Sequence, residues 1–240
     1  MAGSATESVA VGPLDPADSE QVAGFYRTVL LPHFMADELD TEENFAAGLR
    51  LGGSRALVAR AEGGAIVGGA VTDWFDRSHV LLLSYIAVLP SHRSTGAGAA
   101  LMAAVSGSGP AGLRPLLLVA EVEDPRHFAT DPAHGDPWAR WRFYQRLGGR
   151  TLPLPYLQPA LGPGHSRVPH LLLMVLGGSM APPGAERVDG ETVELFLQEY
   201  FEGCEGPVQP GDSQLQELLA ACRGPGGLPL LPPGELPEPG

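Results

Sequence analysis

Apolar residues recur along this chain with two periods, which predict strands and helices. Period-two alternation and short continuous apolar runs predict strands at 8–14, 55–61, 65–74, 80–88, 116–122, 150–154 and 171–176. Apolar residues at helical spacing predict helices at 16–31, 42–49, 99–106, 138–147, 191–200 and 213–222. Because strands and helices alternate around two almost wholly apolar strands, the pattern predicts an α/β fold with one central mixed sheet flanked by helices.

Local signals mark several element ends. Asp15 and Pro16 are residue types preferred at the N-cap and the first position of a helix, so they predict where the first helix begins. Residues 62–64 (Glu-Gly-Gly) separate two strand patterns and predict a hairpin turn. The glycine-rich segment 107–112 is expected to be a loop.

The character of the sequence changes after residue 178, which predicts three parts. Residues 1–178 carry all the predicted strands and are expected to form one domain. Residues 179–223 hold two amphipathic helix patterns and are expected to form a C-terminal helical extension. Residues 224–240 are rich in proline and glycine, so this tail is expected to be extended or disordered.

Composition excludes several classes of protein. The chain has 240 residues, of which 44% are hydrophobic, so wholesale disorder is excluded. No segment reaches the ~20 apolar residues needed to cross a bilayer, and the start lacks the basic and apolar regions of a secretory signal. Cys204 and Cys222 lie outside any metal-ligand spacing, which favours reduced thiols in a cytoplasmic protein that binds no metal. All 15 basic residues are arginine, which suggests a bacterial genome of high GC content.

Charge is distributed unevenly, and this limits the possible partners. The formal net charge is −13, with −7 in residues 1–50, +3 in residues 51–179 and −9 in residues 180–240. Nucleic-acid binding needs a basic footprint and is therefore disfavoured. A mildly positive centre suits an anionic cofactor, and acidic flanks suit a neutral or cationic second ligand. The flanks are equally well explained as solvated faces.

Residues 85–102 (YIAVLPSHRSTGAGAALM) join a buried strand to a helix through a loop suited to binding an anion. Gly96 and Gly98 let a ligand approach the backbone, and free N–H groups at the helix start carry partial positive charge. Arg93 adds a fixed cation beside them. A dinucleotide-binding loop is disfavoured because Leu101 replaces its third glycine, and a Walker loop because the chain has no lysine. The loop therefore predicts a pyrophosphate site.

The same loop resembles a known family signature. Residues 93–98 (RSTGAG), following a strand that ends in 88–90 (VLP), resemble the (Q/R)-x-x-G-x-(G/A) acetyl-CoA motif of the GNAT superfamily of N-acetyltransferases. Residues 143–148 (FYQRLG) resemble the second motif of that family, an aromatic-Tyr-x-x-x-Gly helix end. The two motifs occur in the family's order with one strand between them. The resemblance covers about 8–176 and implies a GNAT-like central mixed β-sheet and acetyl-CoA-dependent acetyl transfer to an amine.

The resemblance also implies a role for individual residues. The strand 85–88 would bulge and part from the strand 116–122, so that the pantetheine of acetyl-CoA lies between them. Tyr144 falls on the family's general acid, which protonates the departing thiolate; the alternative is a core aromatic whose hydroxyl is bonded to backbone. The implied cofactor-binding residues, through backbone groups and the Arg93 side chain, are Ile86, Ala87, Val88, Arg93, Ser94, Thr95, Gly96, Ala97, Gly98, Ala99 and Tyr144.

Two carboxylates are candidates for the general base. Glu121 and Glu123 are two residues apart on one predicted strand, so both side chains project from the same face. Glu121 lies within an apolar run, where a carboxyl should have a raised pKa that suits a base working near neutral pH. In the family's mechanism a neutral amine attacks the thioester directly, and one of these carboxylates or a chain of waters would take its proton. Alternatively, they bind the ammonium of the substrate or end the strand in solvent.

The acceptor pocket of this family is usually built from the first two helices and the loop between the last two strands, here 25–49 and 155–169. The loop offers Tyr156 and Gln158, so the expected acceptor is an amine of a small molecule or a peptide. The helical segment is acidic, which would help to attract such an amine; its acidic residues are Asp37, Glu38, Asp40, Glu42 and Glu43. Four histidines that might reach this pocket have no partner at ligand spacing and are expected to be structural or exposed: His33, His79, His127 and His134.

The chain departs from the family pattern before the tyrosine of the second motif. Pro137 and Arg140 occupy positions where the family often has Asn and Ala, so Arg140 or Trp141 would replace the cofactor contact of the Asn. Two other functions also stay open. The fold can serve as a non-catalytic acyl-CoA-binding or regulatory module. It can also acetylate protein amines, with the extension 179–223 as a docking or dimerisation element in a possible homodimer.

Overall fold

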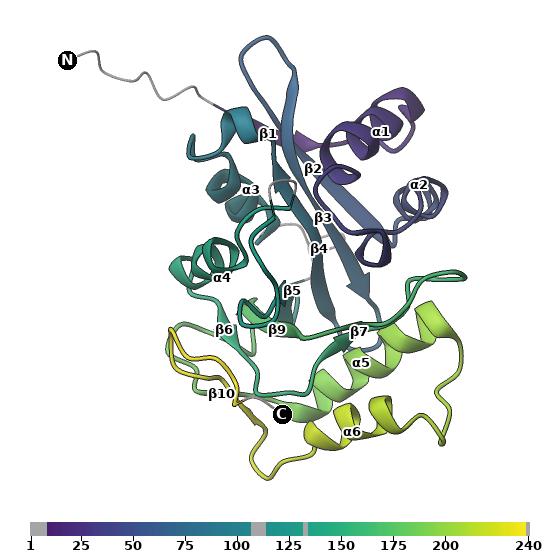
Figure 1. Ribbon diagram of the computed structural model, residues 1–240, viewed down its shortest axis with the longest axis vertical. Coiled ribbons are helices and arrows are strands. Elements are labelled where there is room, and N and C mark those ends of the chain that lie inside the picture. Colours follow the sequence, from purple (N-terminus) through teal and green to yellow (C-terminus); the bar gives the residue numbers. More distant parts are fainter. Residues whose placement is uncertain (1–8, 107–113, 132–133, 239–240) are drawn as a thin grey trace, which may run out of the picture. The chain divides into compact units, whose positions relative to one another are not determined.

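The computed structural model describes residues 9–106, 114–131 and 134–238 (Figure 1). The main sheet is mixed and has seven strands in the order β1-β2-β3-β4-β5-β9-β6, and helices flank it. The chain divides into two compact units. The first unit comprises residues 1–34, 41–73 and 83–109, and the second comprises 35–40, 74–82 and 110–240. The expected loop at 107–112 lies outside the described residues.

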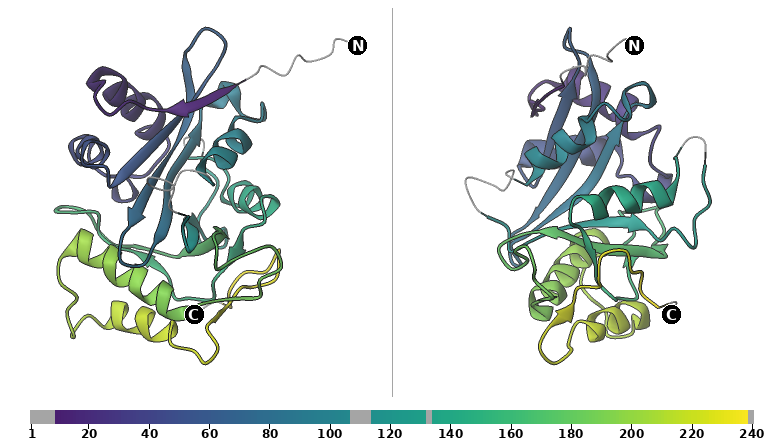
Figure 2. Two further views of the ribbon diagram at one scale, coloured as in Figure 1. Left: turned by 180° about the vertical axis from the view of Figure 1, so that it is seen from behind. Right: turned by 90° about the vertical axis from the view of Figure 1, so that its left-hand side faces the viewer.

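The first unit is built on antiparallel strands with helices on both sides (Figures 1 and 2). Helices α1 and α2 pack together on one side of the strands, and α3 lies on the other (Figure 1). The elements are β1 (Ala10–Pro13), β2 (Ser54–Arg60), β3 (Ile66–Phe75), β4 (Val80–Val88), α1 (Ser19–Phe25), a π-helical turn η1 (Tyr26–Leu30), α2 (Glu42–Leu51), a 3-10 turn η3 (Pro90–His92) and α3 (Ala97–Val105). Gly69 of β3 permits the tight packing of α1, because a Cβ there would lie 2.4 Å from the ring of Phe25.

Two local predictions in this unit have different outcomes. The hairpin at 62–64 is confirmed: the N–H of Ala61 donates to the carbonyl of Ala65, and Gly63 and Gly64 have positive φ. The predicted start of the first helix is wrong by three residues. Asp18 is the N-cap and accepts from the N–H of Gln21 at 3.0 Å, whereas Asp15 accepts from Ala17 and closes the preceding turn.

In the second unit, the strands β5, β9 and β6 form one end of the sheet, and the helices α5 and α6 share its hydrophobic core. Strand β5 pairs antiparallel with β9, and β9 with β6. Helices α5 and α6 lie side by side (Figures 1 and 2). The elements are a 3-10 turn η2 (Ala36–Glu38), β5 (Leu117–Glu123), α4 (Pro137–Arg146), β6 (Arg150–Thr151), β7 (Leu157–Gln158), β8 (Val168–Pro169), β9 (Leu171–Gly177), β10 (Arg187–Val188), α5 (Gly190–Glu205), α6 (Ser213–Ala221) and β11 (Leu228–Pro229).

The ends of the second unit differ from the sequence expectation. The predicted strand 150–154 is regular over two residues only, and the expected loop 155–169 contains the β7–β8 hairpin. The tail is extended at β11, but it is packed: β11 pairs with β10, and Leu228 and Leu230 are buried. The tail is ordered here because Leu228 and Leu230 bury apolar surface against the existing core, which offsets the loss of chain entropy.

The C-terminal extension shares one hydrophobic core with the sheet. Phe196 and Leu197 of α5 belong to the same buried cluster as Leu117 of β5 and Leu173 of β9. The cluster also includes Leu218 of α6. The extension is therefore an integral layer of the second unit.

Three further findings apply to the described residues. No helix among them has the length and apolar character that a membrane crossing requires. No group of His, Cys, Asp and Glu among them could hold a metal ion. Cys204 and Cys222 form no disulfide, and burial raises the pKa of the Cys222 thiol to about 12.

The shared core predicts a large stability loss from a single truncation in α5. Phe196 is 1% exposed, and its ring lies 5.0 Å from that of Phe75. We expect Phe196→Ala to lower the free energy of unfolding by about 3–5 kcal/mol, because it removes buried apolar surface and leaves a cavity. Glu217, an exposed residue of α6, provides a control. Glu217→Ala should change the free energy of unfolding by less than about 0.5 kcal/mol. Urea titrations would measure both; equal losses would show that α5 is not part of the core.

Candidate functional site

The anion loop, residues 93–99, lies in the first unit between β4 and α3. Its backbone is shaped by two residues of positive φ, Ser94 (66°) and Gly96 (93°), and the hydroxyl of Thr95 donates to the carbonyl of His92 at 2.7 Å. Gly96 is the N-cap of α3 and has no side chain, so the first N–H groups of the helix are not capped by a side chain. Such groups are available to an anionic ligand.

The charged and polar side chains of the anion loop are all positive or hydrogen-bond donors. Arg93 is exposed, and its Nε donates weakly to the carbonyl of Val88 at 3.4 Å. Ala97 is buried, which fixes the start of α3. Within the loop a guanidinium, uncapped N–H groups and the positive end of a helix dipole occur together, and this combination fits a pyrophosphate.

The pantetheine prediction concerns the end of β4. Ala87 is buried, while Ile86 and Val88 are partly exposed. Gly68 of β3 allows a close approach here, since a Cβ at that residue would lie 2.7 Å from the carbonyl oxygen of Ala87. The predicted parting of 85–88 from 116–122 stays a prediction.

Tyr144 lies on α4 in the second unit and is 4% exposed. The centre of its ring lies 5.3 Å from that of Phe143. Burial raises the pKa of the phenol above its usual value, while the charge of Arg140 opposes this. The phenol is therefore protonated at neutral pH.

Glu121 is held by three hydrogen-bond donors. The hydroxyl of Tyr156 donates to Oε1 at 2.6 Å, while Nε2 of Gln158 at 3.1 Å and the hydroxyl of Tyr200 at 3.2 Å donate to Oε2. Glu121 as a whole residue is partly exposed, whereas protein surrounds its carboxyl group. The three donors therefore fix the position of the carboxyl.

The surroundings of Glu121 set its proton affinity. Burial raises its pKa from the ordinary value of 4.5 to about 7, because removal from water disfavours the charged form. The three donors lower the pKa in part, and the nearby charge of Glu38 raises it. A carboxyl with a pKa near 7 can accept and release a proton at physiological pH.

Glu123 has a different environment on the same face of β5. Its Oε2 lies 2.8 Å from Nη1 of Arg140, and the carboxyl is buried. Arg140 also donates to the carbonyl of His134 at 2.6 Å. Arg140, one of the residues expected to replace a cofactor contact, is therefore engaged by Glu123 and the backbone of His134.

Two buried oxygens near Glu121 lack a hydrogen-bond partner among the described residues: Oε1 of Glu38 and Oε1 of Gln158. Gln158 is 5% exposed. Burial, followed by the charge of Glu123, raises the pKa of Glu38. Unpaired buried acceptors are costly, so this region favours a ligand that brings hydrogen-bond donors.

The sequence pattern missed Tyr200. It is one apolar-face residue of an amphipathic helix, and no local signal distinguishes it from the core residues around it. The other members of the Glu121 cluster, Tyr156, Gln158 and Glu38, fall within segments expected to serve the acceptor. Only the packing of α5 brings Tyr200 to them.

The four candidate histidines have local partners. Nδ1 of His33 is 2.8 Å from the carbonyl of Val29, and Nδ1 of His134 is 3.1 Å from Oδ1 of Asp131. The remaining two make ring contacts, His79 with Trp74 and His127 with His170.

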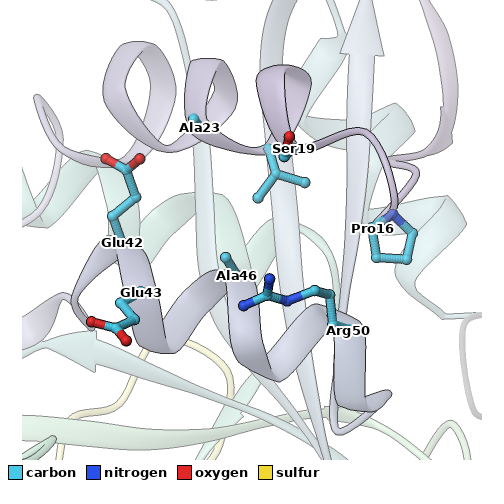
Figure 3. A pocket seen from close by; sticks show the side chains of 8 residues that line it. Pro16, Ser19, Ala23, Glu42, Glu43, Ala46 and Arg50 are labelled. Carbon is cyan, nitrogen blue, oxygen red and sulfur yellow. The ribbon is translucent and has the colours of Figure 1, made fainter.

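The first unit also contains a pocket of about 360 Å³ between α1 and α2 (Figure 3). Figure 3 shows Glu42 and Glu43 at one end of its α2 wall and Arg50 further along the helix. Glu42 pairs with Arg27 at 2.8 Å. Charges of both signs line this pocket, so it offers no clear preference for a cationic acceptor.

Comparisons with known proteins agree with the motifs. Residues 52–148 match a family model described as an acetyltransferase (GNAT) domain. Among solved structures, the chain resembles a GNAT-family protein from Bacteroides thetaiotaomicron, with 22% identity, a TM-score of 0.56, and coverage of 80% of this chain and 98% of that one. That likeness shows the fold.

Two further solved structures match less closely. The ribosomal-protein-S18-alanine N-acetyltransferase of Escherichia coli is 18% identical, with a TM-score of 0.47 and coverage of 74% and 99%. The diaminobutyrate acetyltransferase of Paenibacillus lautus is 16% identical, with a TM-score of 0.46 and coverage of 71% and 95%. The comparison with curated proteins gave no match.

The raised pKa of Glu121 predicts how stability depends on pH. The folded protein holds this proton more tightly than the unfolded chain, so the free energy of unfolding should fall as the pH rises from 4.5 to about 7. Glu121→Gln lacks this titration. We expect the stability of the wild type, relative to Glu121→Gln, to be lower at about pH 8 than at about pH 4 by about 3 kcal/mol. Denaturant titrations at both pH values would measure it, and a difference independent of pH would contradict it.

Proposed function

We propose that this chain transfers an acetyl group from acetyl-CoA to a primary amine of a small molecule or peptide, because residues 52–148 match the model of a GNAT acetyltransferase domain and the fold is that of a GNAT-family protein. The observation that carries this proposal is the Glu121 carboxyl, which is held by three hydrogen-bond donors and has a pKa raised to about 7 by burial.

The anion loop supports binding of acetyl-CoA by its pyrophosphate. Uncapped N–H groups at Ala97, Gly98 and Ala99, with the exposed guanidinium of Arg93, have the charge and the geometry for it. Ser94, Thr95 and Gly96 shape the loop. The backbone of Ile86, Ala87 and Val88 would pair with the pantetheine amides, as the family resemblance implies.

Tyr144 is proposed as the general acid. Acetyl-CoA supplies an activated thioester carbon, which the amine attacks so that a C–N bond forms and the C–S bond breaks. Tyr144 has the proton that the departing sulfur needs, since burial keeps the phenol protonated. The family resemblance assigns this role to the same residue.

Glu121 is proposed as the base, directly or through a water chain. Its pKa of about 7 leaves it largely ionised in mildly alkaline solution, where it can take the proton that the attacking nitrogen loses. Glu123 is less suited to this role because its carboxylate is already paired with Arg140. Glu123 instead holds Arg140 in place.

A cationic or donor-rich acceptor is supported by the same region of the second unit. Glu38 and Gln158 each have a buried oxygen without a partner among the described residues, and an ammonium group would supply N–H donors to such oxygens. The ion pair of Glu123 and Arg140 leaves Glu38 and Glu121 as the carboxyls that a cation would neutralise.

A CoA-release screen tests the proposed function. Acetyl-CoA would be offered with amino acids, polyamines, aminoglycosides and peptide amines, and the products checked by mass spectrometry for one added acetyl group. We expect at least one class of amine to be acetylated with matching release of CoA. Tight binding of acetyl-CoA in calorimetry, without CoA release from any amine, would instead support a non-catalytic acyl-CoA-binding module.

The proposed role of Tyr144 predicts a loss of turnover without a loss of cofactor binding. Tyr144→Phe removes only the hydroxyl, so kcat should fall by roughly 10²–10⁴-fold while the Kd for acetyl-CoA stays nearly unchanged. Arg142→Ala, a change at an exposed position of the same helix, is the control and should retain kcat. Steady-state kinetics and calorimetry measure the two quantities. Full turnover in Tyr144→Phe would remove this residue from the mechanism.

A further inference from the structure

Helix α5 is anchored to the rest of the second unit by a row of acidic residues. Glu199 accepts hydrogen bonds from the backbone N–H groups of Arg77 and Ser78, both at 3.1 Å. Glu202 pairs with the guanidinium of Arg77. Glu205, one turn further on, pairs with Arg167 of the β7–β8 segment. These contacts, three residues apart, lie along one side of α5, and the apolar packing of its other side completes its placement.

In this orientation of α5, the side chain of Tyr200 faces Glu121. Tyr200 is 7% exposed, and its ring lies 5.5 Å from that of Phe75 and 5.8 Å from that of Phe196. Rings packed in this way leave the phenol little freedom, and its hydroxyl donates to Oε2 of Glu121 at 3.2 Å. The donor reaches β5 from a helix almost eighty residues away in the sequence.

We propose that Tyr200 of the C-terminal extension is a positioning residue for Glu121, orienting its carboxyl and tuning its proton affinity. This inference rests on the proposed function, in which Glu121 takes a proton from the acceptor amine. It makes α5 a structural requirement of the site, in addition to any docking role of the extension.

The groups that face Glu121 from other elements allow the effect of Tyr200 to be isolated. Tyr156, which precedes β7, and Gln158 of β7 supply the other two donors. Glu38 of η2 is the nearby acid whose charge acts on Glu121. Loss of the Tyr200 hydroxyl removes one donor and leaves these three groups in place. Because a donated hydrogen bond favours the ionised form, its loss should make Glu121 hold its proton to higher pH.

The test is Tyr200→Phe in the full-length chain, with two readouts. The pKa of Glu121, followed by NMR of ¹³C-labelled glutamate carboxyls and assigned with Glu121→Gln, should rise by about one pH unit. The acidic limb of kcat/KM should shift upward by the same amount, giving about a tenfold loss near pH 6 and little loss near pH 9. The Kd for acetyl-CoA should not change.

Phe201→Leu is the matched control, because Phe201 is buried on the same helix and is not a donor to Glu121. A purely structural role for α5 would make both variants less stable and leave the carboxyl titration in place. An unchanged pKa of Glu121 in folded Tyr200→Phe would therefore overturn the proposal, and Tyr200→Met provides a second variant without the hydroxyl. If the wild type released no CoA from any amine, the proposed function would fail, whereas the NMR titration would still decide the contact between Tyr200 and Glu121.

Discussion

A carboxyl group that protein surrounds has to be neutralised or hydrogen-bonded, and Glu121 imposes this requirement on the second unit. Its two oxygens need donors, and β5 cannot supply them because its own N–H groups are used in the sheet. The donors come from Tyr156 and Gln158 at β7 and from Tyr200 on α5. The β7–β8 hairpin and the C-terminal extension therefore both contact the same side chain of the sheet, that of Glu121.

The placement of α5 also explains part of the uneven charge distribution along the sequence. The acidic C-terminal part, with a net charge of −9, provides Glu199, Glu202 and Glu205, which face the positive middle of the sequence. Arg77 and Arg167 of that middle part are their partners. The opposite charges of these two parts thus hold α5 against its own chain, so the acidic flank is more than a solvated surface.

Much of the fold follows from local patterns in the sequence. The apolar run of β4 and the glycines of the hairpin at 62–64 act over a few residues, so periodicity identifies them. The anion loop is local in the same sense. The packing of α5, the β7–β8 hairpin and the contact of Tyr200 depend instead on residues far apart in the chain. An amphipathic pattern shows that α5 has a buried face, but not which carboxyl that face will meet.

Arg167 limits how the segment 155–169 can be exchanged between related proteins. Its guanidinium binds Glu205 and Asp212 and lies 5.2 Å from the ring of Phe201, all three of them in the extension. If this segment were replaced by that of a relative without the arginine, the carboxylates of Glu205 and Asp212 would lose their partner. Conversely, if this segment were placed in a relative without the extension, Arg167 would lose its partners. The segment 155–169 and helices α5 and α6 would therefore have to be moved between proteins together.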